Sequence, residues 1–320
     1  MRNVGVVTSG GDAPGMNAAI RAVVRIAYSK DFRVLGFERG WEGLIANTFK
    51  PLTPRSVGGI LQLGGTVLRT SRCPRFRTTE GIEKVAETLA LNHVDGLVVI
   101  GGNGSFKGAL KLSLETDTLI VGLPATIDND VFGTDETIGF DTAVNTAVTE
   151  IDKIRDTAIS HERVFIVEVM GRERGFLALT VGLTVGAEMI LVPEAKYKKK
   201  NIFEMLKESS ARGKKSGIIV AAEGVADIRN LARDIEENTG SEVRLSVLGY
   251  AQRGGNPTAR SRLLASLFAD KAVELLVKNQ GNRIVGLQEG GIANVELEKS
   301  CKTEKPLDFS LLQLAKVLAT

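Results

Sequence analysis

The sequence is poor in the residues on which disulfide-rich domains, zinc modules and membrane spans depend. It has only two cysteines, Cys73 and Cys301, with no CxxC spacing, so we expect neither a disulfide framework nor a zinc site. Its apolar runs are far shorter than the roughly 20 residues that a membrane-spanning helix needs. It opens on a strand-like stretch rather than on a signal-peptide pattern. We therefore expect a soluble, cytoplasmic protein with no membrane partner.

A strong excess of charge of one sign is also missing. The chain has 41 lysines and arginines against 38 acidic residues, a net charge of +3, which is too small to indicate a nucleic-acid partner. The densest basic run, residues 196–200, is typical of a solvated loop, with phosphate attraction as the alternative. With 320 residues and 43% hydrophobic content, the chain can form one large domain or two ordinary ones.

Short apolar runs alternate with amphipathic stretches along almost the whole chain. The runs are rich in Val, Ile and Leu on both faces, which is typical of parallel sheets covered by helices on both sides. The pattern predicts an α/β, doubly wound fold. The expected strands are 3–8, 33–37, 96–100, 118–123, 163–169, 189–192, 217–222, 243–248 and 283–288. The expected helices are 15–29, 105–114, 140–158, 175–186, 202–212, 227–238, 258–278 and 308–318.

Nine strands fit two sheets better than one, so the strand count favours two lobes of similar class. We expect the seam between them near 138–140 and a return near 250.

Two segments that follow expected strands are rich in glycine, namely 8–15 (TSGGDAPG) and 101–105 (GGNGS). Glycine lets backbone N–H groups approach an anion, and a helix N-terminus adds a favourable dipole. Neither segment has the P-loop spacing GxxxxGK[ST], and neither is a GxGxxG followed by an acid, which weakens a dinucleotide site. Each alone could be an ordinary strand–helix turn, but together they favour a polyphosphate.

A third segment that follows an expected strand, 124–130 (PATIDND), supplies carboxylates. We call such segments strand exits. Asp128 and Asp130 are two residues apart and share one face of an extended segment. This arrangement suits one general base and one metal-binding or orienting group, with an Asx-rich turn as the alternative.

Arginines bracket two later strands. Arg163 and Arg172 flank one, and Arg244 and Arg253 flank the other. Nine residues of strand span up to about 30 Å, so one chain cannot easily bring both members of a pair to one small ligand. The spacing indicates two anion sites per chain or sites shared across a subunit interface, unless these arginines are only solvated.

Six segments together resemble the bacterial-type ATP-dependent 6-phosphofructokinases (phosphofructokinase family A). They are TSGGDAPGMNAAIR (8–21), GGTVLRTSR (64–72), GGNGSFKGA (101–109), TIDND (126–130), EVMGRERG (168–175) and LGYAQRGGNPTARSR (248–262). The resemblance implies two Rossmann-like lobes that phosphorylate fructose 6-phosphate to fructose 1,6-bisphosphate, the committed step of glycolysis. It also implies ATP as co-substrate, ADP as product, Mg²⁺ as cofactor, and a homotetramer with shared active sites.

The resemblance also assigns the two lobes and their residues. It implies a larger ATP-binding lobe, 1–138 plus 251–303, and a smaller sugar-phosphate-binding lobe, 139–250 plus 304–320. The implied ATP-site residues are Gly11, Arg72, Cys73, Arg77, Gly102, Asn103, Gly104, Ser105 and Gly108. The implied substrate-site residues are Thr126, Asp128, Asp130, Arg163, Met170, Gly171, Arg172, Glu223, Arg244, Tyr250 and Arg253.

Catalytic roles follow from the same resemblance. Asp128 is the implied general base for the sugar 1-hydroxyl, and Thr126 and Asp130 accompany it. Arg72 and Arg172 would neutralise charge on the transferring phosphoryl group, where positioning and electrostatics supply most of the catalysis.

Arg163 and Arg244 match the positions that reach a neighbouring subunit's sugar phosphate. The resemblance thereby resolves the bracketing geometry, because the arginine pairs would divide between two sites.

An effector site is implied as well, in which the family binds ADP as activator and phosphoenolpyruvate as inhibitor. The matching residues are Arg21, Arg25, Arg155, Glu188, Arg212 and Lys214. Arg21 and Arg25 are four residues apart and share one face of the first expected helix. Pro54 and Gly59 stand where bacterial relatives usually carry Arg and Asp.

The phosphoryl donor is indicated by two small residues. Pyrophosphate-dependent relatives place an acid at the position of Gly104 and a lysine at that of Ala125. Gly104 and Ala125 leave the space that the ATP α-phosphate needs, so the sequence favours ATP.

Two departures touch the active site. Asn103 replaces an acid that helps to hold the metal, and its amide oxygen is a weak metal ligand without charge. Tyr250 replaces a histidine that contacts the sugar phosphate, and it can donate a hydrogen bond but cannot become cationic. The alternatives are therefore a weakly active or inactive member that binds nucleotide and sugar phosphate, or a pyrophosphate-dependent variant.

Overall fold

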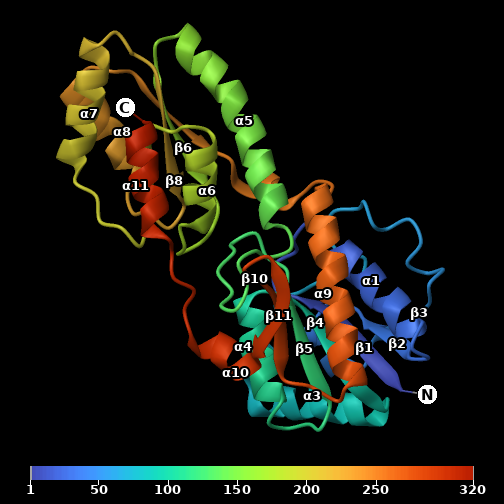
Figure 1. The fold of residues 1–320 in the computed structure, drawn as a ribbon. Coiled ribbons are helices and arrows are strands. Elements are labelled where there is room, and N and C mark those ends of the chain that lie inside the picture. Colours follow the sequence, from blue (N-terminus) through green and yellow to red (C-terminus); the bar gives the residue numbers. More distant parts are fainter. Residues whose placement is uncertain (1, 320) are drawn as a thin grey trace. The chain divides into compact units, whose positions relative to one another are not determined.

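The computed structural model describes residues 2–319, which form two compact units (Figure 1). Unit 1 comprises the chain up to Thr142 together with Arg253–Lys305. Unit 2 comprises Ala143–Gln252 and the chain from Pro306 onward. The division therefore lies just beyond the seam expected near 138–140. The assignment of ATP to one lobe and sugar phosphate to the other stays a prediction.

Unit 1 contains a seven-stranded sheet with the order β11-β10-β5-β4-β1-β2-β3. Its central pairings are parallel, and the edge pairs β2–β3 and β10–β11 are antiparallel. The chain fills one side of β1 first and then the other, so the strand order reverses between β1 and β4. The strands are β1 (Asn3–Ser9), β2 (Arg33–Phe37), β3 (Phe49–Leu52), β4 (Val94–Gly101), β5 (Leu119–Pro124), β10 (Arg283–Gln288) and β11 (Gly291–Glu296).

The register brings three strand exits to the same edge of this sheet. Ser9 pairs with Gly101, and Gly101 pairs with Pro124, so β1, β4 and β5 end side by side. In open α/β sheets, ligands bind beyond the carboxyl ends of strands where the strand order reverses. The fold therefore places the glycine-rich and acidic exits at the position where a ligand site is expected.

Helices cover the sheet and close the core of unit 1. They are α1 (Met16–Tyr28), α2 (Trp41–Ile45), η1 (Pro74–Arg77), α3 (Thr79–Leu91), α4 (Asn103–Leu112), α9 (Ala259–Val277) and α10 (Leu297–Lys302). Helix α1 packs against α9, and α4 packs against α10. Leu97 and Val99 of β4 lie in one buried cluster with Phe106 and Leu112 of α4. This packing fixes α4 against β4, the strand that precedes it.

Unit 2 is built on a four-stranded, all-parallel sheet with the order β7-β8-β6-β9. The strands are β6 (Val164–Val169), β7 (Met189–Leu191), β8 (Gly217–Ala222) and β9 (Val243–Val247). Its helices are α6 (Phe176–Thr184), α7 (Lys199–Ala211), α8 (Ile228–Thr239) and α11 (Phe309–Leu318). Helix α5 (Phe140–Ser160) begins in unit 1 and continues in unit 2, and η2 (Gly249–Arg253) also crosses the boundary.

The expected α/β class with two mainly parallel sheets flanked by helices is confirmed. The expected strands omit β3 and β11, which are antiparallel edge strands without the continuous apolar pattern of the central ones. The expected helices omit α3, although Ile82, Val85 and Leu89 are buried at helical spacing and the Thr78 hydroxyl accepts the Gly81 N–H at its start. Periodicity therefore identified the buried parallel core and missed elements at its margins.

The packing of α4 against the sheet depends on Phe106, and this dependence can be tested. A carbon added at Gly122 of β5 would approach the Phe106 ring to 2.6 Å, so the glycine makes room for this side chain. Phe106→Ala should lower the free energy of unfolding by about 3–5 kcal/mol, because it leaves a cavity in the core. Leu114→Ala, at a side chain 79% exposed, should change it by less than about 0.5 kcal/mol. Equal effects in denaturant unfolding would contradict this packing.

Candidate active site

The exits of β1 and β4 meet too closely to admit side chains. The Ser105 hydroxyl of α4 donates a buried hydrogen bond of 2.8 Å to the Ser9 carbonyl at the end of β1. A carbon added at Gly101 would lie 2.5 Å from that carbonyl and 2.6 Å from the Ser105 hydroxyl. Gly10, the next residue after β1, has φ +87°, which favours glycine. These glycines are therefore required by the geometry of the turn itself.

Gly104 differs from its neighbours, because the protein does not fill the space beside it. A carbon at Gly102 would touch Thr126 at 3.4 Å, and one at Gly108 would meet the Phe76 ring at 2.8 Å. A carbon at Gly104 would meet nothing within 4 Å, and Gly104 is exposed in the first turn of α4. A helix N-terminus with an open approach is suited to an anion. The open space at Gly104 is thus available to a ligand.

The acidic exit follows β5 and forms a loop tied back onto itself. The Ala125 N–H donates to the Gly101 carbonyl at 2.9 Å, and the Thr126 N–H donates to the Ile138 carbonyl at 3.0 Å. The Thr126 hydroxyl accepts the Asp128 N–H at 3.2 Å. These bonds hold the start of the loop against the end of β4, and Asp128 within it is only 8% exposed.

Asn103 connects the glycine-rich exit to the acidic one. Its side-chain amide nitrogen donates a 3.0 Å hydrogen bond to the Asp130 carbonyl. An ionised carboxylate at this position could not donate this bond. Sequence reasoning considered only the amide oxygen of Asn103, because the partner of the nitrogen lies 27 residues away.

Arg253 lies at the exit of β1. Its guanidinium forms an ion pair of 2.5 Å with Asp12, and a carbon added at Gly11 would approach the Arg253 side chain to 2.8 Å. The structure thus brings together Gly11 and Arg253, which the sequence separates by most of its length. Asp12 was not among the expected site residues, although it stands within the glycine-rich segment 8–15.

A third segment of unit 1 runs past the same edge and carries Arg72, Cys73 and Arg77. The Thr8 hydroxyl donates to the Arg69 carbonyl at 2.8 Å, and the Thr70 hydroxyl donates to the Gly10 carbonyl at 2.8 Å. Arg72 and Cys73 line a cavity of about 560 Å³. The expected nucleotide-site residues of unit 1 therefore lie on three neighbouring segments.

In unit 2, several expected sugar-site residues gather at the carboxyl ends of the strands. Arg172 follows β6 with φ +54°, and its backbone N–H donates to the Glu223 carboxylate at 2.6 Å. A carbon at Gly171 would lie 2.6 Å from the Arg174 carbonyl, so this turn also requires glycine. Met170 directly follows β6, and its N–H donates to the side-chain oxygen of Gln252 at 3.4 Å. Tyr250 is 75% exposed in η2.

Arg163 and Arg244 lie at the opposite end of the same sheet, at the amino ends of its strands. Arg163 directly precedes β6, and Arg244 pairs with Phe165 of β6 in the parallel register. Both guanidinium groups form ion pairs with Glu242, and Arg163 is the main cause of the lowered pKa of that carboxyl. Arg163 and Arg172 are thus separated by the length of β6, as their spacing indicated.

The expected effector residues divide between the two units, and their joint role stays a prediction. Arg21 and Arg25 lie on α1, and Arg25 donates to the Pro54 carbonyl at 3.4 Å. In unit 2, Lys214 forms a 2.9 Å ion pair with buried Glu188, which also accepts the Ile218 N–H. Arg155 donates to the Val185 carbonyl, and Arg212 is exposed after α7.

The residues present fit a Mg²⁺ ion that depends mainly on its substrate. Within residues 2–319, no group of three His, Cys, Asp or Glu side chains is placed to enclose a metal. Mg²⁺ commonly keeps several waters and binds one or two carboxylates together with substrate phosphates. Asp128 and Asp130 carry the carboxylates of this loop, and Asn103, whose amide nitrogen bonds to the Asp130 carbonyl, carries a neutral amide oxygen.

None of the helices within residues 2–319 combines the length and apolarity that a membrane crossing requires.

Comparison with known proteins identifies the relatives of the chain. Residues 3–276 match the family described as Phosphofructokinase. The ATP-dependent 6-phosphofructokinase of Clostridium botulinum strain Hall is 49% identical over 320 residues, with the whole of both chains covered.

Two solved structures share the fold. The phosphofructokinase of Saccharomyces cerevisiae superposes with a TM-score of 0.88 at 34% identity, covering 94% of this chain and 45% of that one. The pyrophosphate-dependent phosphofructokinase of Marinobacter aquaeolei superposes with a TM-score of 0.83, covering 98% of this chain and 91% of that one. At 20% identity, the latter shows the fold alone.

The bond between the Asn103 amide and the Asp130 carbonyl yields a prediction about stability. Asn103→Asp should lower the free energy of unfolding without Mg²⁺ by about 1–3 kcal/mol, because a carboxylate oxygen replaces a donor beside a carbonyl oxygen. Asn103→Ala should cost less, because it removes the donor without adding charge. Adding Mg²⁺ should restore part of the stability of Asn103→Asp only. Denaturant unfolding that finds Asn103→Asp as stable as the parent without Mg²⁺ would contradict this account.

Proposed function

The chain belongs to the phosphofructokinase family, and we propose from this that it is an ATP-dependent 6-phosphofructokinase. It transfers the γ-phosphoryl group of ATP to fructose 6-phosphate, giving ADP and fructose 1,6-bisphosphate in glycolysis. The observation that carries the proposal is the open space at Gly104 above the N-terminus of α4, next to the loop that holds the buried Asp128 carboxylate. This arrangement supports a phosphate site next to a candidate base at the carboxyl ends of the strands.

Asp128 acts as the general base that accepts the proton of the sugar 1-hydroxyl. The Thr126 hydroxyl fixes the backbone of Asp128, and Asp130 lies two residues further in the same loop. A general base has to lie within hydrogen-bond reach of the proton that it accepts, so the rigidity of the loop matters. The resemblance gives Arg72 and Arg172 the role of compensating charge on the transferring phosphoryl group.

Mg²⁺ would supply charge neutralisation between the phosphates, and Asp130 and the Asn103 amide oxygen would help to hold it. Loss of one protein carboxylate at position 103 is compatible with activity, because this ion depends strongly on substrate phosphates.

The donor is ATP rather than pyrophosphate. Gly104 leaves open the space that an acid would fill. Ala125 is fully buried, and its N–H donates to the Gly101 carbonyl. Its methyl side chain offers no positive charge to a pyrophosphate. The alternative of a member that only binds its ligands is favoured by Asn103 and Tyr250, but it does not account for the retention of Asp128 and of the arginines.

The active site is completed between subunits of a cytoplasmic homotetramer. Arg163 and Arg244 lie at the sheet edge opposite Arg172, and a sugar phosphate bound near Arg172 is out of their reach within one chain. They serve the neighbouring subunit's sugar phosphate, and the expected effector residues regulate the assembly.

The activity can be tested with purified protein, fructose 6-phosphate, Mg²⁺ and either ATP or pyrophosphate. The protein should form fructose 1,6-bisphosphate with ATP. Asp128→Ala should lower kcat by about 10²–10⁴-fold, because the reaction loses its general base. Asp117→Ala, exposed before β5, is the matched control and should keep its turnover. Ligand binding without turnover for either donor would refute the enzyme assignment.

The shared site makes a separate prediction. Arg244→Ala should raise the KM for fructose 6-phosphate about 10-fold or more, because one charged hydrogen bond to phosphate contributes about 1.5–3 kcal/mol. The KM for ATP should change little. Arg233→Ala, exposed on α8, should alter neither value. Equal losses of affinity for sugar phosphate and ATP would argue against a role of Arg244 in sugar-phosphate binding.

A further inference from the structure

The loop that carries the two carboxylates is held by its central residue. Asn129 stands between Asp128 and Asp130 with φ +51° and is 6% exposed. Its amide nitrogen donates to the Asp135 carbonyl at 3.1 Å, and its amide oxygen accepts the Thr137 N–H at 3.0 Å. Asn adopts the left-handed region more readily than most residues, and the two side-chain bonds fix Asn129 in this loop. They thereby restrict the backbone from which the side chains of Asp128 and Asp130 extend.

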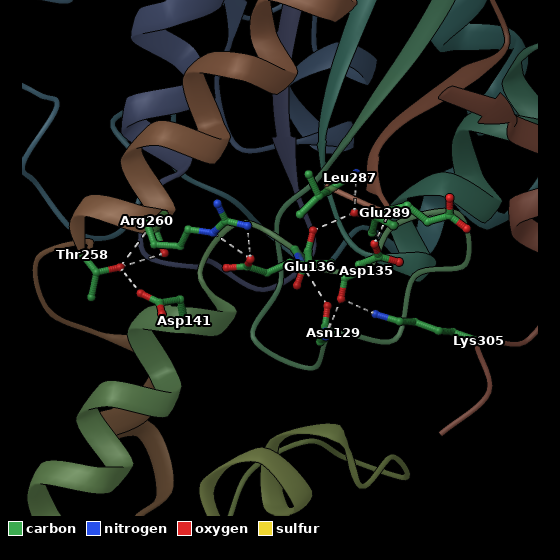
Figure 2. Close-up of polar contacts among 12 residues, drawn as sticks. Asn129, Asp135, Glu136, Asp141, Thr258, Arg260, Leu287, Glu289 and Lys305 are labelled. Carbon is green, nitrogen blue, oxygen red and sulfur yellow. Dashed lines mark hydrogen bonds and ion pairs between the residues drawn. The ribbon is translucent and has the colours of Figure 1, made fainter. Parts of the chain in front are cut away.

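The acceptor of the first bond is shared with a lysine from the far end of the chain. Lys305 follows α10, and its ammonium donates to the Asp135 carbonyl at 2.9 Å (Figure 2). The Asp135 carbonyl oxygen thus accepts one hydrogen bond from Asn129, within the loop, and one from Lys305, outside it. The position of this oxygen therefore affects both side chains.

Other contacts fix Asp135 itself against the β10–β11 hairpin. Its N–H donates to the Leu287 carbonyl at 2.7 Å, and its carboxylate accepts the Glu289 N–H at 2.9 Å. Arg260 of α9 forms a 2.8 Å ion pair with the next residue, Glu136 (Figure 2). The backbone at Asp135 and Glu136 is therefore held in place without Lys305. What the lysine adds is a second donor to the Asp135 carbonyl, which restricts the orientation of that oxygen toward Asn129.

The electrostatics of Lys305 point the same way. Burial lowers the pKa of its ammonium to about 8, although the carboxylates of Asp135, Asp130 and Glu136 act in the opposite direction. Because the pKa is lower in the folded chain than the ordinary 10.5, the charged lysine opposes folding below pH 8. Stability should rise as the pH increases from about 8 to 10.5. A half-buried ammonium kept at a cost in stability indicates a role other than stability.

We infer that Lys305 is a positioning residue for phosphoryl transfer. Its ammonium holds the Asp135 carbonyl in the orientation that Asn129 needs, and Asn129 in turn directs Asp128 and Asp130. Lys305 touches no reacting atom in this account. The inference rests on the proposed function, because the geometry that it protects is that of the proposed base.

The test compares Lys305→Met with the parent in the same assay. Methionine keeps the apolar stem and removes the charge and the donor. The kcat should fall by about 5–50-fold, while the KM for ATP changes by less than about twofold, because only the reacting geometry is disturbed. The melting temperature at pH 7 should stay the same or rise. Lys305→Arg should recover most of the lost kcat, since a guanidinium can donate to the same carbonyl.

The matched control is Lys302→Met, which removes an exposed lysine of α10 that pairs with Glu298. It should leave kcat unchanged. Hydrogen exchange at the Thr137 amide supplies a readout that does not need turnover, and this amide should exchange faster in Lys305→Met because the Asn129 oxygen that protects it is less well held.

The outcomes separate the two proposals. An inactive parent refutes the proposed function, and the exchange of the Thr137 amide then decides the link from Lys305 to Asn129. An active parent with an unchanged kcat in Lys305→Met overturns the positioning role. A fall in kcat accompanied by a lower melting temperature and no recovery in Lys305→Arg also overturns it, because that result describes an ordinary structural contact.

Discussion

The candidate site depends on one close approach, between the end of β1 and the first turn of α4. The Ser105 hydroxyl bonds to the Ser9 carbonyl across a gap in which Gly101 can carry no side chain. This contact brings the switch point of the seven-stranded sheet and a helix N-terminus to one place. An anion can approach there because Gly104, unlike its neighbours, is surrounded by open space. Neighbouring segments of unit 1 bring carboxylate and guanidinium side chains to the same end of the sheet.

Two side chains fix the loop that carries the carboxylates by donating hydrogen bonds to its backbone carbonyls. Asn103 and Lys305 each donate to a carbonyl of the acidic loop, at Asp130 and Asp135 respectively. The Asn103 bond contributes to the stability of the loop, whereas the Asp135 carbonyl keeps the Asn129 donor when Lys305 is removed. In the proposed mechanism they restrict the direction of the carboxylates, which a general base requires. Asn103 is therefore part of the architecture of the loop.

Much of this arrangement could be predicted from residues. The strand expected at 33–37 coincides with β2, and the exits at 8–15 and 101–105 lie together as expected, because parallel strands buried on both faces have an unmistakable apolar pattern. Helix α3 was missed although its buried positions repeat at helical spacing. The edge strands β3 and β11 were missed because antiparallel strands at a margin need no continuous apolar run.

The sequence by itself determined the fold class, the order of the strand exits and the family, because these follow from local periodicity and from contiguous motifs. The tertiary structure alone decided which atoms meet. Lys305 and Asp135 are 170 residues apart, and no local pattern predicts their bond. The same holds for Arg253 beside Gly11 and for the amide nitrogen of Asn103. Hydrogen bonds have a reach of about 3 Å, so they are set by the register of strands and the packing of loops, and these exist only after the chain has folded.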